Sequence, residues 1–599
     1  MPAPRALDPV ATRAPGRLAT GWPVVVAAAL AVIALLPAWG AAGRYSARYD
    51  WRYFDAMTEA ARRTVVWYHQ APLWNPYSCG GEVGLANPQS LDGAPTFVLV
   101  LLFGTALGLK LALALYLFAA IDGTRRLGVH LGLAPPAALV AGVGFGLSGY
   151  LAVRFATGHL SFLGVTLFPT LLLCFDRSLG AEPRAWRWLV PAGLVAAWIA
   201  LLGGTFTPPM AVELLVGWAA LRAIERRSAR PFVHLLVLGA VALAAGAVRL
   251  LPALEFVRDH PRPAFVRAPD RSTAWQVLAD LVATRELAPL AGRKYWGHEY
   301  AARLPALVAI LAAAALPLAA LARDPGRRRV VRGLWLLAAA AALLAMGNFA
   351  TLAPWSLLQR LPVLRDLRVP SRHLVLVALP LALLAGFALD AALAWLRGRG
   401  VRRAVTVGLA AAAVTLAAAD GAWATARAFR GVFTVTLPSP PRPARFYHTR
   451  GHWQTMRETL FAGQGSLECD EAAPLQRAQG LEVGDVPQVR LLDAGAGQVR
   501  AASFSPNRWR AALDLGRGTT LLLNANWNEH WRARPGRAVS LGGRLAVDLG
   551  GLPPGRHEVT AWYRPRSFLA GAVVTGLTLP ACLLAFALAR RRRGRASSG

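Results

Sequence analysis

Apolar runs of about twenty residues recur along most of the chain and alternate with short basic stretches. A helix needs about 20 apolar residues to cross the hydrocarbon core of a bilayer. The sequence therefore predicts a mainly α-helical, polytopic membrane protein with about twelve transmembrane helices. The predicted spans lie near residues 21–39, 104–121, 134–153, 160–176, 187–204, 208–224, 232–252, 304–322, 333–348, 373–396, 403–420 and 568–589.

A different pattern begins after residue 420. Short alternating stretches, such as 509–515 and 557–563, are separated by Gly, Pro and Asn. Alternation with a period of two is typical of half-buried strands. We expect a β-sandwich here. The predicted organisation is a multi-span domain over 1–420, an all-β domain over 421–566, and a final helix with a basic tail over 567–599.

Composition and charge agree with a membrane protein. Of the 599 residues, 55% are hydrophobic and only 16% are charged, which excludes a disordered chain. Lys and Arg exceed Asp and Glu by 65 − 32 = 33, and the arginines gather in the loops between apolar runs. This distribution follows the positive-inside rule and does not favour nucleic-acid binding. We expect both termini in the cytoplasm, with outer loops over 40–94, 253–303 and 349–372 and a periplasmic or extracellular β-domain over 421–566.

The first outer loop contains the main catalytic candidate, Asp50. Apolar residues recur with helical spacing from Trp51 to Tyr68. This spacing predicts an amphipathic helix on the outer membrane surface, with Asp50 at its first turn. A carboxylate there is either an N-cap, or a general base or metal ligand at the boundary between water and lipid. No motif requires a cofactor. If Asp50 is a metal ligand, the cation is expected to be divalent, Mg²⁺ or Mn²⁺.

Other outer loops supply further candidates. Ionisable groups near a membrane usually mark a site or pathway, and arginines with carboxylates suit a phosphate-bearing lipid. We expect one shared face near the outer leaflet to carry Asp50, His159, Arg249, Glu255, His298, Glu299, Arg368 and Arg372. The turn-rich first loop adds Trp74, Asn75, Asn87 and Gln89. Each residue alone also has a structural explanation, such as capping or snorkelling.

The four cysteines fall into two groups. Cys174 and Cys582 lie in apolar runs and are expected to be core residues. Cys79 and Cys469 fall on the predicted outer side, where disulfides persist. They either bridge the first loop to the β-domain or remain free thiols, because sequence does not fix the pairing.

Several motifs occur together in a distinctive order. They are Asp50, residues 73–76 with 87–90, Leu251-Pro252 with Glu255, residues 298–300, Leu361-Pro362 with 368–372, residues 523–531 and residues 554–565. Together they resemble the YfhO-like family of bacterial membrane proteins, within the GT-C-fold glycosyltransferase superfamily. The similarity covers nearly the whole chain.

The resemblance implies an enzyme of the bacterial inner membrane. It would transfer a sugar from a polyprenyl-phosphate donor to a glycan, lipid or protein acceptor in the cell envelope. Asp50 would be the base or metal ligand, with His298 and Glu299 as further catalytic candidates. Arg368 and Arg372 would hold the phosphate. Arg249 is an added candidate, although relatives are expected to carry a neutral amide there.

Two other classes of function remain open from the sequence. A transporter or flippase for lipid-linked sugars would also have about twelve spans. A non-catalytic envelope assembly protein would use the β-domain to bind glycan, with Trp527 and Trp531 stacking on sugar rings.

Overall fold

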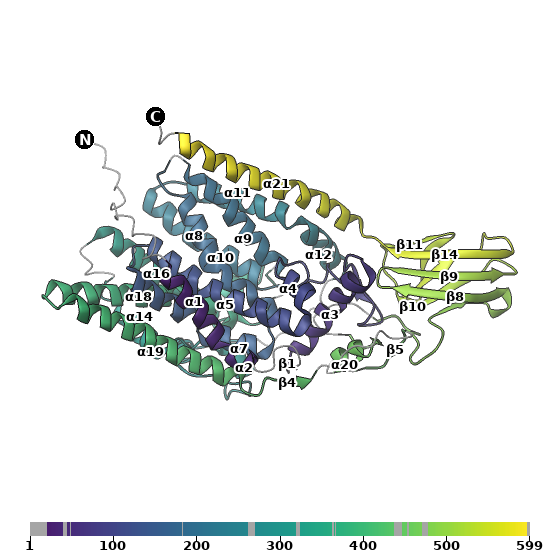
Figure 1. Cartoon of the computed structure of the whole chain (residues 1–599), viewed down its shortest axis with the longest axis horizontal. Helices are drawn as coiled ribbons and strands as arrows, with labels where there is room; N and C mark the ends of the chain where they lie inside the picture. Colours follow the sequence, from purple (N-terminus) through teal and green to yellow (C-terminus); the bar gives the residue numbers. More distant parts are fainter. Residues whose placement is uncertain are drawn as a thin grey trace.

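The computed structural model describes residues 21–39, 45–47, 49–182, 184–260, 270–318, 324–361, 364–365, 367–436, 446–451, 455–469 and 477–595. It is a bundle of helices from which a β-sandwich projects at one end, called here the β-domain end (Figure 1). The α-helices are α1 (Trp22–Ala34), α2 (Leu36–Trp39), α3 (Trp51–Tyr68), α4 (Phe97–Phe103), α5 (Thr105–His130), α6 (Pro135–Gly146), α7 (Gly149–Thr157), α8 (Phe168–Ser178), α9 (Leu189–Leu201), α10 (Thr207–Arg226), α11 (Arg230–Ala245), α12 (Ala247–Asp259), α13 (Ala274–Val282), α14 (Ala306–Ala314), α16 (Pro325–Ala345), α17 (Pro354–Leu358), α18 (Leu374–Gly398), α19 (Arg403–Phe429), α20 (Met456–Phe461) and α21 (Arg566–Arg595).

Shorter elements complete the chain. The 3₁₀ helices are η2 (Leu160–Leu167), η3 (Ala185–Trp188), η4 (Gly297–Tyr300), η5 (Pro370–His373) and η7 (Ala494–Ala496). The strands are β1 (Tyr45–Ala47), β2 (Trp74–Asn75), β3 (Glu82–Val83), β4 (Phe433–Thr436), β5 (His448–Thr449), β6 (Gly465–Ser466), β7 (Val489–Leu491), β8 (Gly497–Ser505), β9 (Arg508–Leu515), β10 (Thr520–Asn526), β11 (Trp531–Arg534), β12 (Arg537–Leu541), β13 (Arg544–Asp548) and β14 (Gly555–Tyr563).

Within the described ranges, six helical segments are long and apolar enough to cross a membrane. They are Thr105–His130, Pro135–Thr157, Leu160–Ser178, Pro370–Gly398, Arg403–Phe429 and Arg566–Leu588. The pair α11 and α12, bent by 87°, makes a seventh if it is one broken span. Each predicted stretch does contain helix. The count of twelve spans is not confirmed, because the other helices are short or, like α16 with its arginines 327–329 and 332, too polar.

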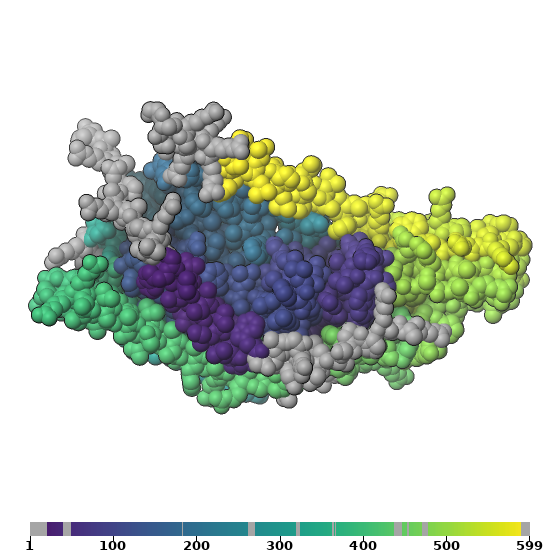
Figure 2. Space-filling view, viewed as in Figure 1, coloured from purple at the N-terminus to yellow at the C-terminus, as the bar shows by residue number. Residues whose placement is uncertain are grey.

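Helix α18 forms the centre of the bundle. Its residues from Leu374 to Leu389 are buried on every side, between α6, α14 and α16. Because the sequence is apolar around the whole helix, no face of α18 suits water. Helices α1, α19 and α21 lie on the surface of the molecule, and α21 runs back from the sandwich along α11 and α12 (Figures 1 and 2).

The C-terminal region folds as two four-stranded antiparallel sheets. Their strand orders are β12-β13-β10-β7 and β11-β14-β9-β8. Along β9, residues alternate between buried and more exposed positions, as the sequence pattern predicted. Leu513, Leu545 and Val559 are among the residues that form the core. The preceding helix α19 extends to Phe429, past the predicted end of that span at residue 420.

Helix α3 has the predicted bounds, but the prediction that it lies on a surface is wrong. Its charged face is covered by α20 and α5, so Asp55, Glu59 and Arg63 are all buried. Asp55 lies 3.3 Å from Arg457 of α20, and Arg63 donates to Glu59 over 3.0 Å. The polar residues between the apolar positions of α3 therefore meet charged partners instead of water.

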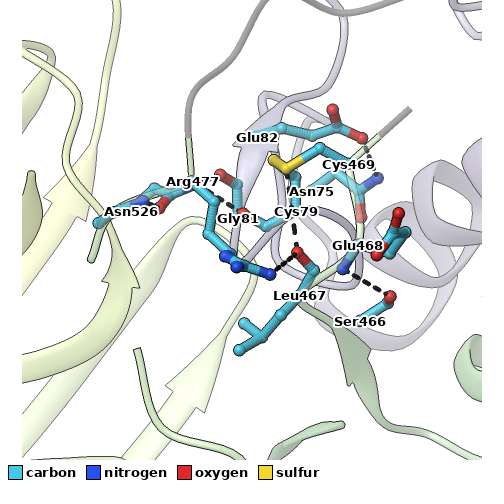
Figure 3. Close-up of a disulfide and its surroundings, with 11 residues drawn as sticks. Asn75, Cys79, Gly81, Glu82, Ser466, Leu467, Glu468, Cys469, Arg477 and Asn526 are labelled. Carbon is cyan, nitrogen blue, oxygen red and sulfur yellow. Dashed lines mark hydrogen bonds between the residues drawn. A yellow bond between two sulfur atoms is a disulfide. The ribbon is translucent and has the colours of Figure 1, made fainter. Parts of the chain in front are cut away.

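The first loop is fastened to the C-terminal region by covalent and polar contacts (Figure 3). Cys79 and Cys469 form a disulfide, which resolves the two alternatives that the sequence left open. The side-chain amide of Asn526 donates to the carbonyl oxygens of Cys79 and Gly81, over 2.6 and 2.9 Å. Strand β10 therefore holds the same turn that the disulfide holds.

Candidate active site

Asp50 and His159 meet at the β-domain end of the helices. The Oδ2 atom of Asp50 lies 3.2 Å from Nε2 of His159, and the Asp50 side chain is 52% exposed. Asp50 is the N-cap residue of α3, yet its side chain makes no capping hydrogen bond. Its backbone N–H instead donates to the carbonyl oxygen of Thr157, two residues before His159. The carboxylate is therefore directed to the imidazole and to solvent, not to the start of the helix.

The other ring nitrogen of His159 identifies the tautomer. Nδ1 lies 3.1 Å from a terminal nitrogen of Arg154. A guanidinium has donors and no acceptor, so Nδ1 must accept this hydrogen bond. A neutral His159 then carries its proton on Nε2, the nitrogen nearest to Asp50. Asp50 thus faces a proton donor with one oxygen, which leaves its second oxygen to take up a proton.

Glu299 connects this pair to two arginines. It accepts from Arg154 over 2.8 Å and from Nε of Arg372 over 3.0 Å. A second hydrogen bond joins Arg372 to the other carboxylate oxygen. Burial alone would raise the pKa of Glu299, but the charges of Arg372 and Arg154 outweigh burial and hold that pKa well below its usual range. Glu299 is therefore an anion that orders the two guanidinium groups.

His298 extends the cluster beside His159. The two rings are 5.3 Å apart between centroids, and Nε2 of His298 lies 3.9 Å from Glu299. Burial, assisted by the positive charges nearby, lowers the pKa of His298 to about 4. Within the described part of the chain, its Nδ1 is buried without a hydrogen-bond partner. A neutral imidazole with one unsatisfied nitrogen can bind a hydroxyl group of a ligand.

Arg154 is a component of the site that sequence reasoning missed. It is completely buried in α7 and bonds both to the side chain and to the backbone carbonyl of Glu299. Its guanidinium also lies over the rings of Tyr150 and Phe162, at 4.7 and 4.9 Å. An arginine inside an apolar run was the available signal, because a charge within a span usually has a functional partner.

Arg249 lies apart from this cluster. Its guanidinium donates to the carbonyl oxygens of Asn87 and Leu201, and the whole side chain is buried. Gly93 and Gly203 leave the space that it fills, since an added Cβ would approach Arg249 within 2.9 and 2.8 Å. Arg249 therefore fastens the first loop to the C-terminal end of α9, and its side chain is buried and not exposed on a surface shared with Asp50.

Two candidates of the first loop lie in the segment that Arg249 fastens. The amide of Asn87 lies 3.4 Å from the hydroxyl of Tyr53, and its side-chain oxygen accepts from the backbone of Gln89 over 2.9 Å. Asn87 is buried, so its side chain is not available to a ligand, whereas Gln89 is half-buried. Both shape the loop that follows α3.

Trp74, Asn75 and Glu255 serve the attachment of the β-domain. Trp74 is buried against Trp531, at 5.5 Å between ring centroids, so neither tryptophan offers a face to a sugar. Asn75 accepts from the backbone of Tyr77 inside the same turn. Glu255 lies 3.2 Å from His530, between α12 and the sandwich. The expected single face for all eight ionisable residues is therefore divided, because Arg249 and Glu255 are used in packing.

Arg368 stands on the segment that leads to Arg372. Its carbonyl oxygen accepts from the hydroxyl of Tyr295 over 3.1 Å. Arg372 itself lies over the rings of Phe206 and Phe162, at 4.2 and 5.1 Å. Pro362, part of the motif expected before these arginines, lies outside the described residues. The two predicted phosphate ligands thus border the Asp50 cluster on one segment.

The cluster also contains a group of potential metal ligands. Nitrogen or oxygen atoms of His159, His298 and Glu299 lie within 4.8 Å of one another. The donor set does not match Mg²⁺ or Mn²⁺, which prefer oxygen ligands. Both oxygens of Glu299 also bond to guanidinium groups, whose charges repel a cation. Asp50 is outside this group of three, so the residues do not fit the cation considered from the sequence.

Comparisons with known proteins give distant similarities. No protein-family model matches the chain, and no curated protein sequence does. The solved structure of arabinofuranosyltransferase AftD from Mycobacteria is similar with a TM-score of 0.46 and 18% identity, covering 72% of this chain and 29% of that one. ArnT from Cupriavidus metallidurans without ligand has a TM-score of 0.44 and 15% identity, with 76% and 87% covered. ArnT bound to undecaprenyl phosphate scores 0.43, with the same identity and coverage.

The present chain spans less than a third of the length of AftD. Membership of the YfhO-like family stays a prediction.

Proposed function

We propose that this protein is a membrane glycosyltransferase that moves a sugar from a polyprenyl-phosphate donor to an acceptor in the cell envelope. One observation carries the proposal: an exposed carboxylate, Asp50, faces a connected chain of His159, Arg154, Glu299 and Arg372, of which Arg154 and Glu299 are buried. This combination supplies a base beside guanidinium groups, at the end of apolar helices. In the proposed arrangement the protein lies in a bacterial inner membrane, with the β-domain end outside the cytoplasm and both termini inside.

The reaction needs one proton transfer and one displacement. The hydroxyl oxygen of the acceptor forms a bond to the anomeric carbon of the sugar, and the bond from that carbon to the phosphate oxygen breaks. The electron pair of the broken bond leaves with the polyprenyl phosphate. The free oxygen of Asp50 takes the hydroxyl proton, while His159 holds the other oxygen in place. No nucleotide is consumed in this step.

The leaving phosphate requires positive charge. Arg372 is fixed by Glu299 and by two aromatic rings, and Arg368 precedes it on the same segment. Guanidinium groups held in place offset the charge that develops on the phosphate without reorganising during the reaction. Two guanidinium groups share Glu299, so one positive charge is left over for an anionic substrate. We assign Arg368 and Arg372, and not Arg249, to the phosphate.

The direct test is Asp50→Asn in the full-length protein reconstituted with a polyprenyl-phosphate sugar. Loss of a general base lowers turnover by about 10²–10⁴-fold. Asp514→Asn changes a partly exposed carboxylate on β9, 33% exposed and also paired with a basic residue; it is the control and should retain full turnover. Membrane insertion and yield should be the same for all three proteins. Full turnover by Asp50→Asn, or movement of the lipid-linked sugar across the bilayer without cleavage, would contradict the proposal.

A further inference from the structure

A cavity that the proposed reaction does not use lies next to the turn that carries Asp50. Its volume is about 420 Å³. Tyr49, which precedes Asp50, and Thr157, which bonds to the backbone of Asp50, form part of its wall. The remaining wall comes from α7, from the loop after α13, from Ala301 and Arg303 before α14, and from the C-terminal end of α19 with the residues that follow it. The cavity is therefore built by five separate parts of the chain at the β-domain end.

Arginines dominate the charge of this cavity. Its lining includes Arg285, Arg303, Arg427 and Arg430, against one carboxylate, Glu286. Arg303 lies 2.7 Å from Asp420, Arg285 lies 2.7 Å from Asp280, and Arg427 lies 2.5 Å from Glu286.

Arg293, which does not line the cavity, also pairs with Asp280, so five arginines in and around the cavity share three carboxylates. The surplus of positive charge suits an anion with several oxygens, such as a phosphate.

The outer surface of α19 indicates what kind of molecule carries that anion. Leu409, Leu416 and Trp423 are 46%, 61% and 53% exposed, and they are spaced by seven residues. Positions seven apart lie on the same face of a helix. This apolar stripe leads toward Arg427 and Arg430, and Arg427 lies over the ring of Trp423 at 5.8 Å. Trp followed by Arg at the end of an apolar span is typical of the membrane interface.

We propose that this cavity binds the phosphate head of an anionic lipid whose hydrocarbon chain lies along the exposed stripe of α19. The site is separate from Arg368 and Arg372, and it places a second lipid head beside the turn that carries Asp50. The proposal shares with the proposed function only the placement of the β-domain end at a membrane interface. Lipid binding is therefore tested without measuring sugar transfer.

The experiment uses the full-length protein in a neutral detergent and measures bound lipid by native mass spectrometry. Wild type, the double variant Arg427→Gln/Arg430→Gln and the control Arg500→Gln are titrated with phosphatidylglycerol and with a polyprenyl phosphate. Arg500 is an exposed arginine of β8 that pairs with Asp514, so its replacement removes one exposed, paired arginine charge at another place, where the double variant removes two. Arg427 and Arg430 are exposed, and their replacement should leave the temperature of thermal unfolding unchanged.

The double variant should bind at least one of the two lipids about tenfold more weakly or worse, since it lacks two charge-assisted contacts. A loss for polyprenyl phosphate would make the cavity a second contact for the donor lipid. A loss for phosphatidylglycerol alone would make it a site for a membrane lipid or an acceptor lipid. Affinity equal to that of wild type for both lipids, or an equal loss in Arg500→Gln, would overturn the proposal. Neither result depends on whether Asp50 is catalytic.

Discussion

Arg154 donates a hydrogen bond to Nδ1 of His159 over 3.1 Å, and by doing so it determines which ring nitrogen faces Asp50. Arg154 is buried and held by Glu299, so its position does not depend on a substrate. The orientation of the Asp50 carboxylate is thus established through His159 by the buried residues Arg154 and Glu299. In the proposed reaction His159 is therefore a positioning residue, and we expect its removal to have effects that differ from those of removing Asp50.

Replacing His159 should reduce turnover while leaving donor binding nearly unchanged. In His159→Phe the carboxylate of Asp50 loses the N–H group that holds it, and we expect kcat to fall by about 10²-fold. His159→Gln keeps an N–H donor and should recover part of that loss. Steady-state kcat and KM measured for both variants check this. Equal kcat in His159→Phe and wild type would show that Asp50 needs no orientation.

Replacing Glu299 should destabilise the fold. Glu299→Gln leaves Arg154 and Arg372 in a buried place without a counter-charge, which typically costs 3–5 kcal/mol, so we expect a loss of about 3 kcal/mol or more. Thermal unfolding in detergent measures this loss. Glu286→Gln removes an exposed carboxylate that also pairs with an arginine, and it should change stability by about 1 kcal/mol at most. Similar unfolding temperatures for the two variants would contradict the structural role of Glu299.

His298 should make the stability of the protein depend on pH between about 4 and 6.5. Burial lowers the pKa of His298 to about 4, so in that range the unfolded chain binds a proton that the folded chain does not. Stability therefore falls as the pH falls from 6.5 toward 4, by about 3 kcal/mol in all. The pKa of Glu299 is held well below its usual range, so Glu299 keeps its charge throughout this window.

The variant His298→Gln tests this origin of the pH dependence. Unfolding should be measured at several pH values for wild type and variant. The variant should show a flatter profile between pH 4 and 6.5, and the two proteins should differ least at pH 7 and above. Parallel profiles would assign the pH dependence to other groups.

Breaking the disulfide should loosen the first loop. Cys469→Ala removes one of the two bonded sulfur atoms, and we expect the free energy of unfolding to fall by about 2–4 kcal/mol. The turn at Cys79 and Gly81 should then become a site for limited proteolysis, which gel electrophoresis detects. Cys582→Ala, a cysteine of α21 that is not bridged, is the control. Free thiols at both positions in the non-reduced wild-type protein would contradict the bridge.

The sequence predicted the elements more successfully than the site. Apolar runs located the helices, and alternation located strands such as β9 and β14, because these patterns are local. The bounds of α3 also followed from its spacing. The partners of its charged residues did not, because Arg457 lies about 400 positions away from Asp55. A local pattern contains no information about such a contact.

The candidate site could be predicted only in part, because local patterns identify its residues but not their contacts. Asp50, His159, His298, Glu299 and Arg372 were each proposed as ionisable residues of outer loops, and the structure brings them together. Arg249 is predicted for the same face as Arg372, but its side chain is buried in the space that Gly93 and Gly203 leave. Whether an arginine is exposed or buried there depends on space between loops, which the sequence pattern does not show.

The bridge between Cys79 and Cys469 also sets an order of events during biogenesis. Cys469 follows α20, so the ribosome must have synthesised every described α-helix except α21 before the bridge can close. In the proposed arrangement, with the β-domain end outside the cytoplasm, both segments must have crossed the bilayer before a thiol oxidant reaches their sulfur atoms. On this arrangement the bridge marks chains whose membrane insertion is nearly complete, and it fastens the first loop to the C-terminal region only in those chains.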